Sequence, residues 1–225
     1  RLLPFQQVYH LKAVSDNLLF VGSGQLKAII GYQQNRRQEY EESPEEYGLC
    51  FWLHTVNYDV RYLLSSDSGW QLAAGLGGIW QQSENRGDEY LIPAYSLFDA
   101  GVFANTTKAF GEWTVSGGLR VDVRRLHSKA LEGRFEDFRR NFPGVSASLG
   151  VVRPLGRFLT VRANLARGFR APNMAELGSN GEHEGTFRFE VGSKDLNPEN
   201  SLQADLGLDF SSRYVSVQAA VFVSR

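Results

Sequence analysis

Residues 113–124 read W-T-V-S-G-G-L-R-V-D-V-R, with apolar and polar residues in alternation. In an extended chain one side carries Trp113, Val115, Gly117, Leu119, Val121 and Val123. The other side carries Thr114, Ser116, Gly118, Arg120, Asp122 and Arg124. A period of two residues is typical of a β-strand with one apolar face, whereas an amphipathic helix repeats every 3.6 residues. The stretch therefore predicts a strand between an apolar and a polar environment.

The same alternation recurs in three further runs, and helical periodicity is nearly absent. The apolar members are Leu26, Ala28, Ile30 and Tyr32, then Leu159, Val161, Ala163 and Leu165, then Leu202, Ala204, Leu206, Leu208 and Phe210. In 48–64 the apolar residues change parity between Leu53 and Tyr58, which predicts a β-bulge near Thr55–Asn57.

Turn signals are spaced regularly along the chain. Short Gly/Ser/Asp turns centre near residues 23, 67, 111, 155 and 212, so their separations are 44, 44, 44 and 57. Longer polar connections lie between them, at 36–47, 83–92, 127–140 and 168–200. Such alternation of tight turns and extended loops is typical of outer-membrane barrels. We therefore predict an all-β fold, an antiparallel up-and-down transmembrane β-barrel fragment of about ten long strands.

A soluble β-propeller is the competing architecture, because its blades repeat at about 40–45 residues. A blade holds four short strands, however, whereas each 44-residue unit here fits two long ones. Trp70 and Trp113 begin strands directly after short turns, on the same side as the apolar residues that follow. This is the place of an interfacial aromatic girdle, which favours the membrane barrel.

Composition excludes several classes of protein. Lys and Arg number 24 against 25 Asp and Glu, which gives a net charge of −1 and argues against nucleic acid as a partner. No run approaches the ~18 apolar residues of a membrane helix. Cys50 is the single cysteine, so no intrachain disulfide is expected. The chain begins at Arg1 without a signal peptide and ends within an alternating run, so we interpret it as a piece of a longer protein.

The segment after Arg162 resembles a known family, the TonB-dependent outer-membrane receptors. Five pieces carry the resemblance in order and spacing: GFRAPN at 168–173, EL at 176–177, SNG at 179–181 with His183, FEVG at 189–192 and LNPE at 196–199. Weaker resemblance lies at 31–40 and 91–95. The resemblance implies a 22-stranded barrel with an N-terminal plug domain, driven through TonB. With no plug visible, we expect residues 1–225 to be a partial barrel domain.

Arg170 is a candidate ligand-binding residue, because it precedes Ala171-Pro172 at a predicted strand end and would bind an anion there. The alternative is a structural role for the family motif, with Arg170 ion-paired to the barrel wall. The motif residues are Phe169, Arg170, Ala171, Pro172, Asn197, Pro198 and Glu199. Pro172 suits the first position of a short helix through Glu176-Leu177, since its missing N–H would be unpaired there.

Glu182, His183 and Glu184 lie among glycines and offer oxygen and nitrogen ligands to a metal or metal chelate. In haem receptors a histidine between the Phe-Arg-Ala-Pro piece and a downstream Asn-Pro piece ligates haem. His183 falls in that interval. The downstream piece here is Leu-Asn-Pro-Glu instead of the haem type Asn-Pro-Asn-Leu, so a plain loop histidine stays open as the alternative. His183 is thus the candidate metal ligand.

Other charged residues have simpler interpretations. The acidic loop with Glu39, Glu41, Glu42, Glu45 and Glu46 is a solvated tip or a collector of cations. Arg37, Arg120, Arg124, Arg162, Asp122 and Asp205 are expected to face a hydrated lumen. We find no catalytic arrangement and predict no enzyme and no cofactor.

The predicted function is part of an outer-membrane receptor for TonB-driven uptake of a scarce nutrient, as a siderophore, haem or metal ion, in a Gram-negative cell. The implied partners are outer-membrane lipid, TonB, the plug domain and the small-molecule cargo. A passive or structural small barrel and a soluble β-repeat binding module remain the alternatives.

Overall fold

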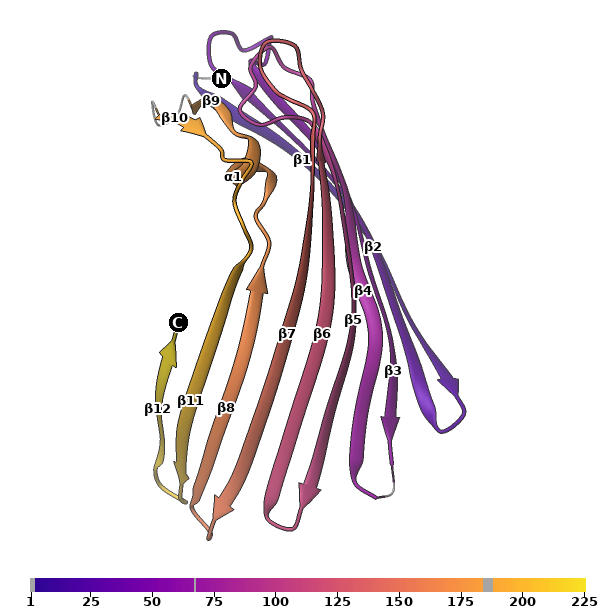
Figure 1. The fold of residues 1–225 in the computed structure, drawn as a ribbon, viewed down its shortest axis with the longest axis vertical. Helices are drawn as coiled ribbons and strands as arrows, with labels where there is room; N and C mark the ends of the chain where they lie inside the picture. Colours follow the sequence, from indigo (N-terminus) through magenta and orange to yellow (C-terminus); the bar gives the residue numbers. More distant parts are fainter. Residues whose placement is uncertain (1–2, 67, 184–187) are drawn as a thin grey trace.

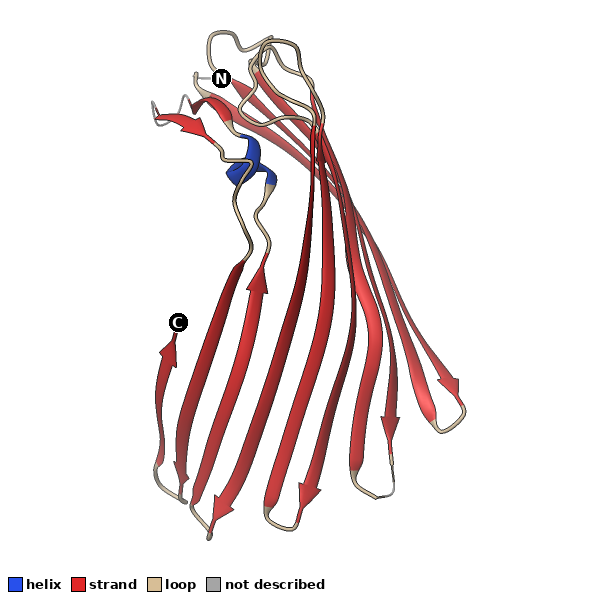
Figure 2. Ribbon diagram, viewed as in Figure 1, coloured by secondary structure: helices blue, strands red, loops and turns tan. Residues whose placement is uncertain are grey.

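The computed structural model describes residues 3–66, 68–183 and 188–225, and for Glu182 and His183 it describes the backbone alone. Ten long antiparallel strands form one sheet (Figures 1 and 2). They are β1 (Phe5–Val21), β2 (Gly24–Tyr40), β3 (Leu49–Ser65), β4 (Trp70–Asn85), β5 (Tyr95–Phe110), β6 (Trp113–Ser128), β7 (Phe138–Leu155), β8 (Leu159–Arg170), β11 (Glu199–Ser211) and β12 (Ser216–Ser224). The predicted all-β, up-and-down antiparallel arrangement is confirmed.

Strands that follow one another along the chain are neighbours in this sheet. The last long connection, between the paired strands β8 and β11, carries structure of its own. That connection contains α1 (Met174–Gly178), β9 (Asn180–His183) and β10 (Arg188–Val191). The sheet is an open curved wall with β1 and β12 at its edges (Figure 1). None of the helical structure in the described residues has the length and apolar character needed to cross a membrane.

Short turns lie at one end of the wall and long connections at the other (Figure 2). Gly22 and Gly111 adopt positive φ in the short turns, a conformation that glycine adopts without strain. All four long connections begin later in the chain than predicted. Polar residues such as Arg36, Arg37 and Gln38 continue β2, because each still pairs with a residue of β3.

Strand β3 runs without the bulge predicted near Thr55–Asn57. Its register is unbroken against both neighbours, from Glu39↔Leu49 to Gly24↔Leu64 and from Phe51↔Asn85 to Ser65↔Gln71. The prediction was wrong because it assumed that one side of the strand is apolar throughout. Near the long connections the opposite side is covered, and Leu49 is buried there.

The two faces of the wall differ in chemistry, because paired residues in a sheet project to the same side. The first we call the apolar face; a typical row across β4 to β7 is Leu76, Val102, Val121 and Val145, all exposed. Trp70 and Trp113 lie at its short-turn end, as predicted, and the Trp70 ring meets Phe110 edge-on with 6.3 Å between centroids.

The opposite side, which we call the polar face, carries all six charged residues expected to face a lumen: Arg37, Arg120, Arg124, Arg162, Asp122 and Asp205. Ion pairs and hydrogen bonds hold several of them in place. Arg162 Nη2 donates to Asp209 Oδ1 at 2.8 Å, and Asn164 Nδ2 donates to Asp205 Oδ2 at 3.3 Å. All six thus lie on one face of the sheet, as the alternation predicts.

The connection between β8 and β11 packs against the polar face near the long-connection end. Met174 and Leu177 of α1 are buried against Leu97, Leu126 and Phe142 of the sheet. Burying an apolar side chain of this size contributes about 1.5–3 kcal/mol relative to leaving it exposed. Hydrophobic burial therefore holds this long loop on the wall.

Candidate functional site

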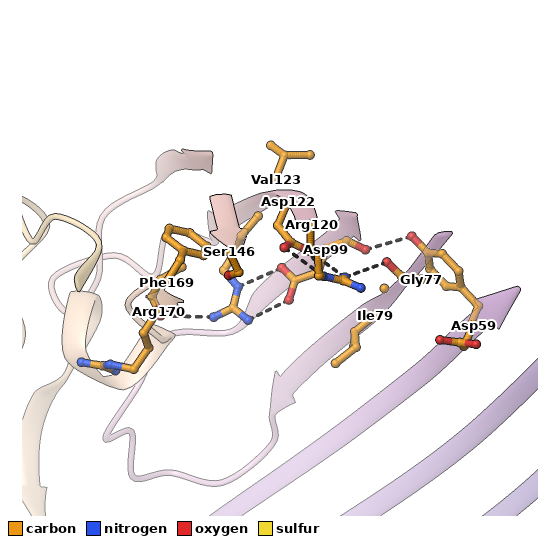
Figure 3. A pocket seen from close by; sticks show the side chains of 14 residues that line it. Asp59, Gly77, Ile79, Asp99, Arg120, Asp122, Val123, Ser146, Phe169 and Arg170 are labelled. Carbon is orange, nitrogen blue, oxygen red and sulfur yellow. Dashed lines mark hydrogen bonds and ion pairs between the residues drawn. The ribbon is translucent and has the colours of Figure 1, made fainter. Parts of the chain in front are cut away.

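A hollow of about 500 Å³ lies on the polar face where the β8–β11 connection meets the sheet. Charged side chains from β3, β5 and β6 line it, and Phe169 closes one side (Figure 3). Three carboxylates and three guanidinium groups are among the lining residues: Asp59, Asp99, Asp122, Arg120, Arg124 and Arg170. Each of the six forms an ion pair, Asp59 with Arg61 and Arg170 with Glu176 and Glu199, so the wall of the hollow is polar and its charges are paired.

Asp99 and Arg124 form the central ion pair of this hollow. They are cross-strand partners of β5 and β6, and their contact is bidentate, with Nε–Oδ1 at 2.8 Å and Nη2–Oδ2 at 2.7 Å. Both side chains are largely shielded, with 21% and 25% of their surface exposed. The remaining Arg124 Nη1 donates to the Ala171 carbonyl at 3.4 Å. The pair thus connects the sheet to the start of the long loop.

Arg120 and Asp122 form a second pair, two residues apart on β6. Arg120 Nε lies 2.7 and 2.9 Å from the two carboxylate oxygens, and Arg120 Nη2 donates to the Gly77 carbonyl at 3.3 Å. Gly101 lies opposite Asp122, and a Cβ there would lie 2.1 Å from the carboxylate. Glycine at this position therefore leaves room for the pair.

Phe169 covers the hollow from the β8 side. A Cβ on Gly144 would lie 2.3 Å from the Phe169 ring, so the ring occupies the space that a side chain at 144 would fill. Phe169 also packs against the cluster formed by α1 and the sheet. The motif residue is thus one wall of the hollow and one support of the loop.

Arg170 belongs to a different network, and its side chain points away from Asp99 and Arg120 (Figure 3). Its guanidinium donates to both oxygens of Glu199, at 2.9 and 2.7 Å, and to both oxygens of Glu176 at 2.9 Å. Arg170 thereby joins the end of β8 to the start of β11 and to α1. This arrangement is the ion-paired, structural alternative considered from sequence.

Helix α1 begins with a capping box. Asn173 is the N-cap, its Oδ1 accepts from the Glu176 backbone N–H, and Glu176 accepts from the Asn173 backbone N–H, both at 2.9 Å. That hydrogen bond and Arg170 hold the pKa of Glu176 below its usual value. Pro172 precedes the cap, so placing it at the first helical position was wrong. A proline at the N-cap could make neither bond of the capping box, because it has no backbone N–H and no side-chain acceptor.

Of the other predicted ligand residues, Glu182 and His183 have their backbones in the same loop, between α1 and β11. Glu182 and His183 end β9, where their backbones pair with Phe189 and Arg188 of β10, and Glu184 lies outside the described residues. Asn197 is exposed and Pro198 half-buried just before β11. Across the described part of the chain, no group of three or more His, Cys, Asp or Glu side chains is placed to hold a metal ion.

The acidic loop meets a residue from the next connection. Glu89 donates its backbone N–H to the Gly48 carbonyl at 3.0 Å. Burial, followed by the carboxylates of Glu42, Glu39 and Asp88, raises the pKa of Glu89. The backbone contact thus brings the connection after β4 next to the acidic loop.

Sequence reasoning found Arg124 but missed its partner Asp99. The information was present, because a hairpin that turns at Gly111-Glu112 pairs residues whose numbers add to 223, and 99 + 124 = 223. The hydrogen bond from Arg124 to the Ala171 carbonyl could not be found in this way, because the two residues are 47 positions apart and do not belong to one hairpin.

Comparison with known proteins agrees with this architecture. The family described as "TonB dependent receptor-like, beta-barrel" matches residues 7–225. The chain belongs to this family of TonB-dependent receptor barrels. No curated protein sequence matches it.

Solved structures of TonB-dependent receptors share the fold. The Serratia marcescens hemophore receptor HasR, solved in complex with its hemophore HasA and heme, superposes with a TM-score of 0.78 at 18% identity, over 98% of this chain and 40% of HasR. The copper transporter OprC gives 0.73 at 18% identity, over 97% and 38%. The Yersinia pestis ferric yersiniabactin uptake receptor FyuA gives 0.63 at 15% identity, over 98% and 36%.

The chain therefore spans about two fifths of these receptors. At such identities the likeness shows the fold alone. Within that fold the hollow on the polar face lies beneath the β8–β11 loop and is lined by fixed, mutually neutralised ion pairs. Such a surface offers both hydrogen-bond donors and acceptors to a polar molecule without attracting one sign of charge.

Proposed function

We propose that this chain is part of the barrel of an outer-membrane receptor that imports a scarce nutrient, as a metal chelate, with energy from TonB. One observation carries the proposal: a single wall has an exposed apolar face and a polar face of paired charges, in a chain of this receptor family. A membrane barrel requires this division, because lipid covers one face and water the other.

Residues 1–225 would form a partial barrel domain, with further strands and a plug domain supplied by the rest of the receptor. The open sheet supports this division, since β1 and β12 are not paired with each other. A small passive barrel of ten strands would need that pairing. The cargo proposal draws on relatives named for hemophore and heme, copper and ferric yersiniabactin.

Within this proposal, capture of the cargo falls to the outer part of the β8–β11 loop. Glu182, His183 and Glu184 are the proposed contacts, with His183 as the metal ligand. Arg170 would act by holding the loop, since two carboxylates already engage its guanidinium. The ion pairs of the hollow would line the passage beneath.

The test is uptake by cells that carry the complete receptor gene or its deletion, grown on ferric siderophores, haem or copper as the scarce nutrient. We expect deletion to abolish uptake of one cargo, and a TonB-null strain to show the same loss. Uptake that persists without TonB would contradict an energised receptor. Unchanged uptake of the whole panel would contradict the cargo class.

Direct cargo binding tests the residues. His183→Gln in the complete receptor should weaken binding of the transported cargo at least tenfold, which corresponds to about 1.4 kcal/mol. His54→Gln is the matched control, because His54 lies on β3 with its Nδ1 2.8 Å from the Tyr32 hydroxyl, away from this loop. Equal affinity in both variants would remove His183 from the site.

A further inference from the structure

The apolar face ends in a row that combines aromatic and basic residues. Trp80, Phe98, Arg125 and Asn141 are successive cross-strand partners on β4, β5, β6 and β7. They therefore lie side by side on one face, all exposed. The next row toward the long connections contains Ser96, His127 and Arg139, again as cross-strand partners. Residues from both rows line a hollow of about 320 Å³.

The position of this hollow follows from the rows below it. The next three rows toward the short turns hold only apolar residues: Gly78, Ala100, Val123 and Pro143, then Leu76, Val102, Val121 and Val145, then Ala74, Ala104, Leu119 and Ala147. Trp70 and Trp80 are ten residues apart on β4, which at ~3.3 Å per residue and a ~40° tilt places them about 25 Å apart across the membrane. The hollow thus lies at the boundary of an apolar band of the expected height.

Two guanidinium groups in this hollow are unengaged. Across the residues that the structure describes, Arg125 and Arg139 have no ion pair, hydrogen bond or ring contact with another side chain. The neighbouring acid, Asp137, accepts a hydrogen bond from His127 Nε2 at 2.9 Å. By contrast, Arg120, Arg124 and Arg170 each form an ion pair with a carboxylate.

At the boundary of the apolar band, unpaired arginines are matched chemically by the phosphate groups of lipid heads. Guanidinium groups bind phosphate oxygens through short, charge-assisted hydrogen bonds. Basic pockets at the membrane boundary bind lipid head groups, and aromatic rings at the same level contact the upper part of the acyl chains. Trp80 and Phe98 lie beside Arg125 as such a binding mode requires.

We propose that Arg125, Arg139 and Asn141 bind a phosphate of a lipid head group, with Trp80 and Phe98 against its acyl chains. The ligand belongs to the leaflet at the long-connection end. This inference rests on the proposed membrane location and goes beyond nutrient uptake, because it assigns a lipid site on the outside of the barrel.

The experiment uses the complete receptor, purified from outer membranes and exchanged into detergent with added lipid A as the probe. Native mass spectrometry counts the lipid A retained by wild type, by Arg125→Gln/Arg139→Gln and by Arg157→Gln/Arg213→Gln. The last variant removes two positive charges at the short-turn end, where both residues are exposed. We expect about tenfold weaker retention in the first double variant alone, and weaker retention of dephosphorylated lipid A by wild type.

Several results would overturn the site. They are equal retention by both double variants, displacement of lipid A by inorganic phosphate, or a photo-crosslinker at Asn141 that captures protein instead of lipid. Cargo uptake and heat-modifiable mobility, measured in the same cells, should be normal in both double variants. A wild-type receptor absent from the outer membrane would contradict the proposed function, whereas a normal receptor without differential lipid binding contradicts only this inference.

Discussion

The carboxylate of Glu176 stabilises both the start of α1 and the ion pairs of Arg170. It caps α1 through the Asn173 backbone and holds Arg170, which in turn reaches Glu199 on the next strand of the sheet. The loop is therefore tied at its base by charge and hydrogen bonds, and at its middle by buried Met174 and Leu177. In this structure the motif residues Arg170 and Glu199 therefore hold the base of the loop.

The pH response of the loop follows from the lowered pKa of Glu176. The ionised form is favoured in the folded loop, so its contribution is complete above the usual value of 4.5 and is lost as pH falls through the lower folded pKa. We expect protection of the α1 amides to fall as pH drops below about 4.5, in hydrogen exchange corrected for intrinsic rates. Glu176→Gln should flatten this response, and Glu199→Gln should retain it. A response unchanged by Glu176→Gln would refute the assignment.

The Gly144–Phe169 contact gives a prediction about packing. Gly144→Ala would place a methyl group 2.3 Å from the ring, and overpacking of this kind costs about 1–3 kcal/mol. Adding Phe169→Leu should recover part of the loss in urea unfolding of the complete receptor. Gly117→Ala is the control, because the nearest atom to its Cβ is 3.8 Å away. Equal effects of the two glycine substitutions would mean that the ring moves freely.

At the scale of the element, the unit of this protein is a long hairpin. Each short turn sets the register of two strands, and the register sorts residues onto the two faces. The ion pair between Asp99 and Arg124 is a direct product of one such hairpin. The start of β3 shows the limit of the rule, since the apolar Leu49 lies on the polar face and is buried there.

The faces of β8 are tested by neighbouring substitutions. Ala163 pairs with Val151 and Leu206 on the apolar face, whereas Asn164 pairs with Gly150 and Asp205 on the polar face. In the complete receptor, Ala163→Arg should reduce the free energy of unfolding by about 2–4 kcal/mol if it lies at the bilayer midplane. Asn164→Arg should cost much less, because its side chain stays in water. Folding titrations that give equal costs would contradict the facing.

At the scale of the whole molecule, the wall has two unlike ends. Short turns gather at one end, while the long connections and the folded loop gather at the other (Figure 1). The hollow on the polar face and the hollow on the apolar face both lie toward the second end. A receptor of this kind would present that end to the outside of the cell.

Thiol labelling of the complete receptor tests this orientation. In a Cys50→Ser background, single cysteines at Glu42, Glu132 or Asp195 should react with an impermeant reagent on intact cells. Cysteines at Ser23, Glu112 or Arg213 should react only after the outer membrane is breached. All six positions are exposed and lie outside the long strands. Mixed labelling within either set would show that the two ends are wrongly assigned.

The sequence by itself determined the strand number, the two faces and the membrane-barrel class. These features are local: alternation is a property of adjacent residues, and a short turn sets the pairing of the strands that flank it. For the same reason the alternating pattern alone is enough to place Trp70 and Trp113 on one face and the six charged residues on the other.

Only the tertiary structure decided what the loops cover and which charges remain unpaired. The docking of α1 on Leu97 and Phe142, the bond from Arg124 to Ala171, and the free state of Arg125 and Arg139 among the described residues depend on segments far apart in the chain. A periodic pattern places a side chain on a face, yet it does not choose among several partners within reach. That choice rests on packing and burial, which exist only in the folded wall.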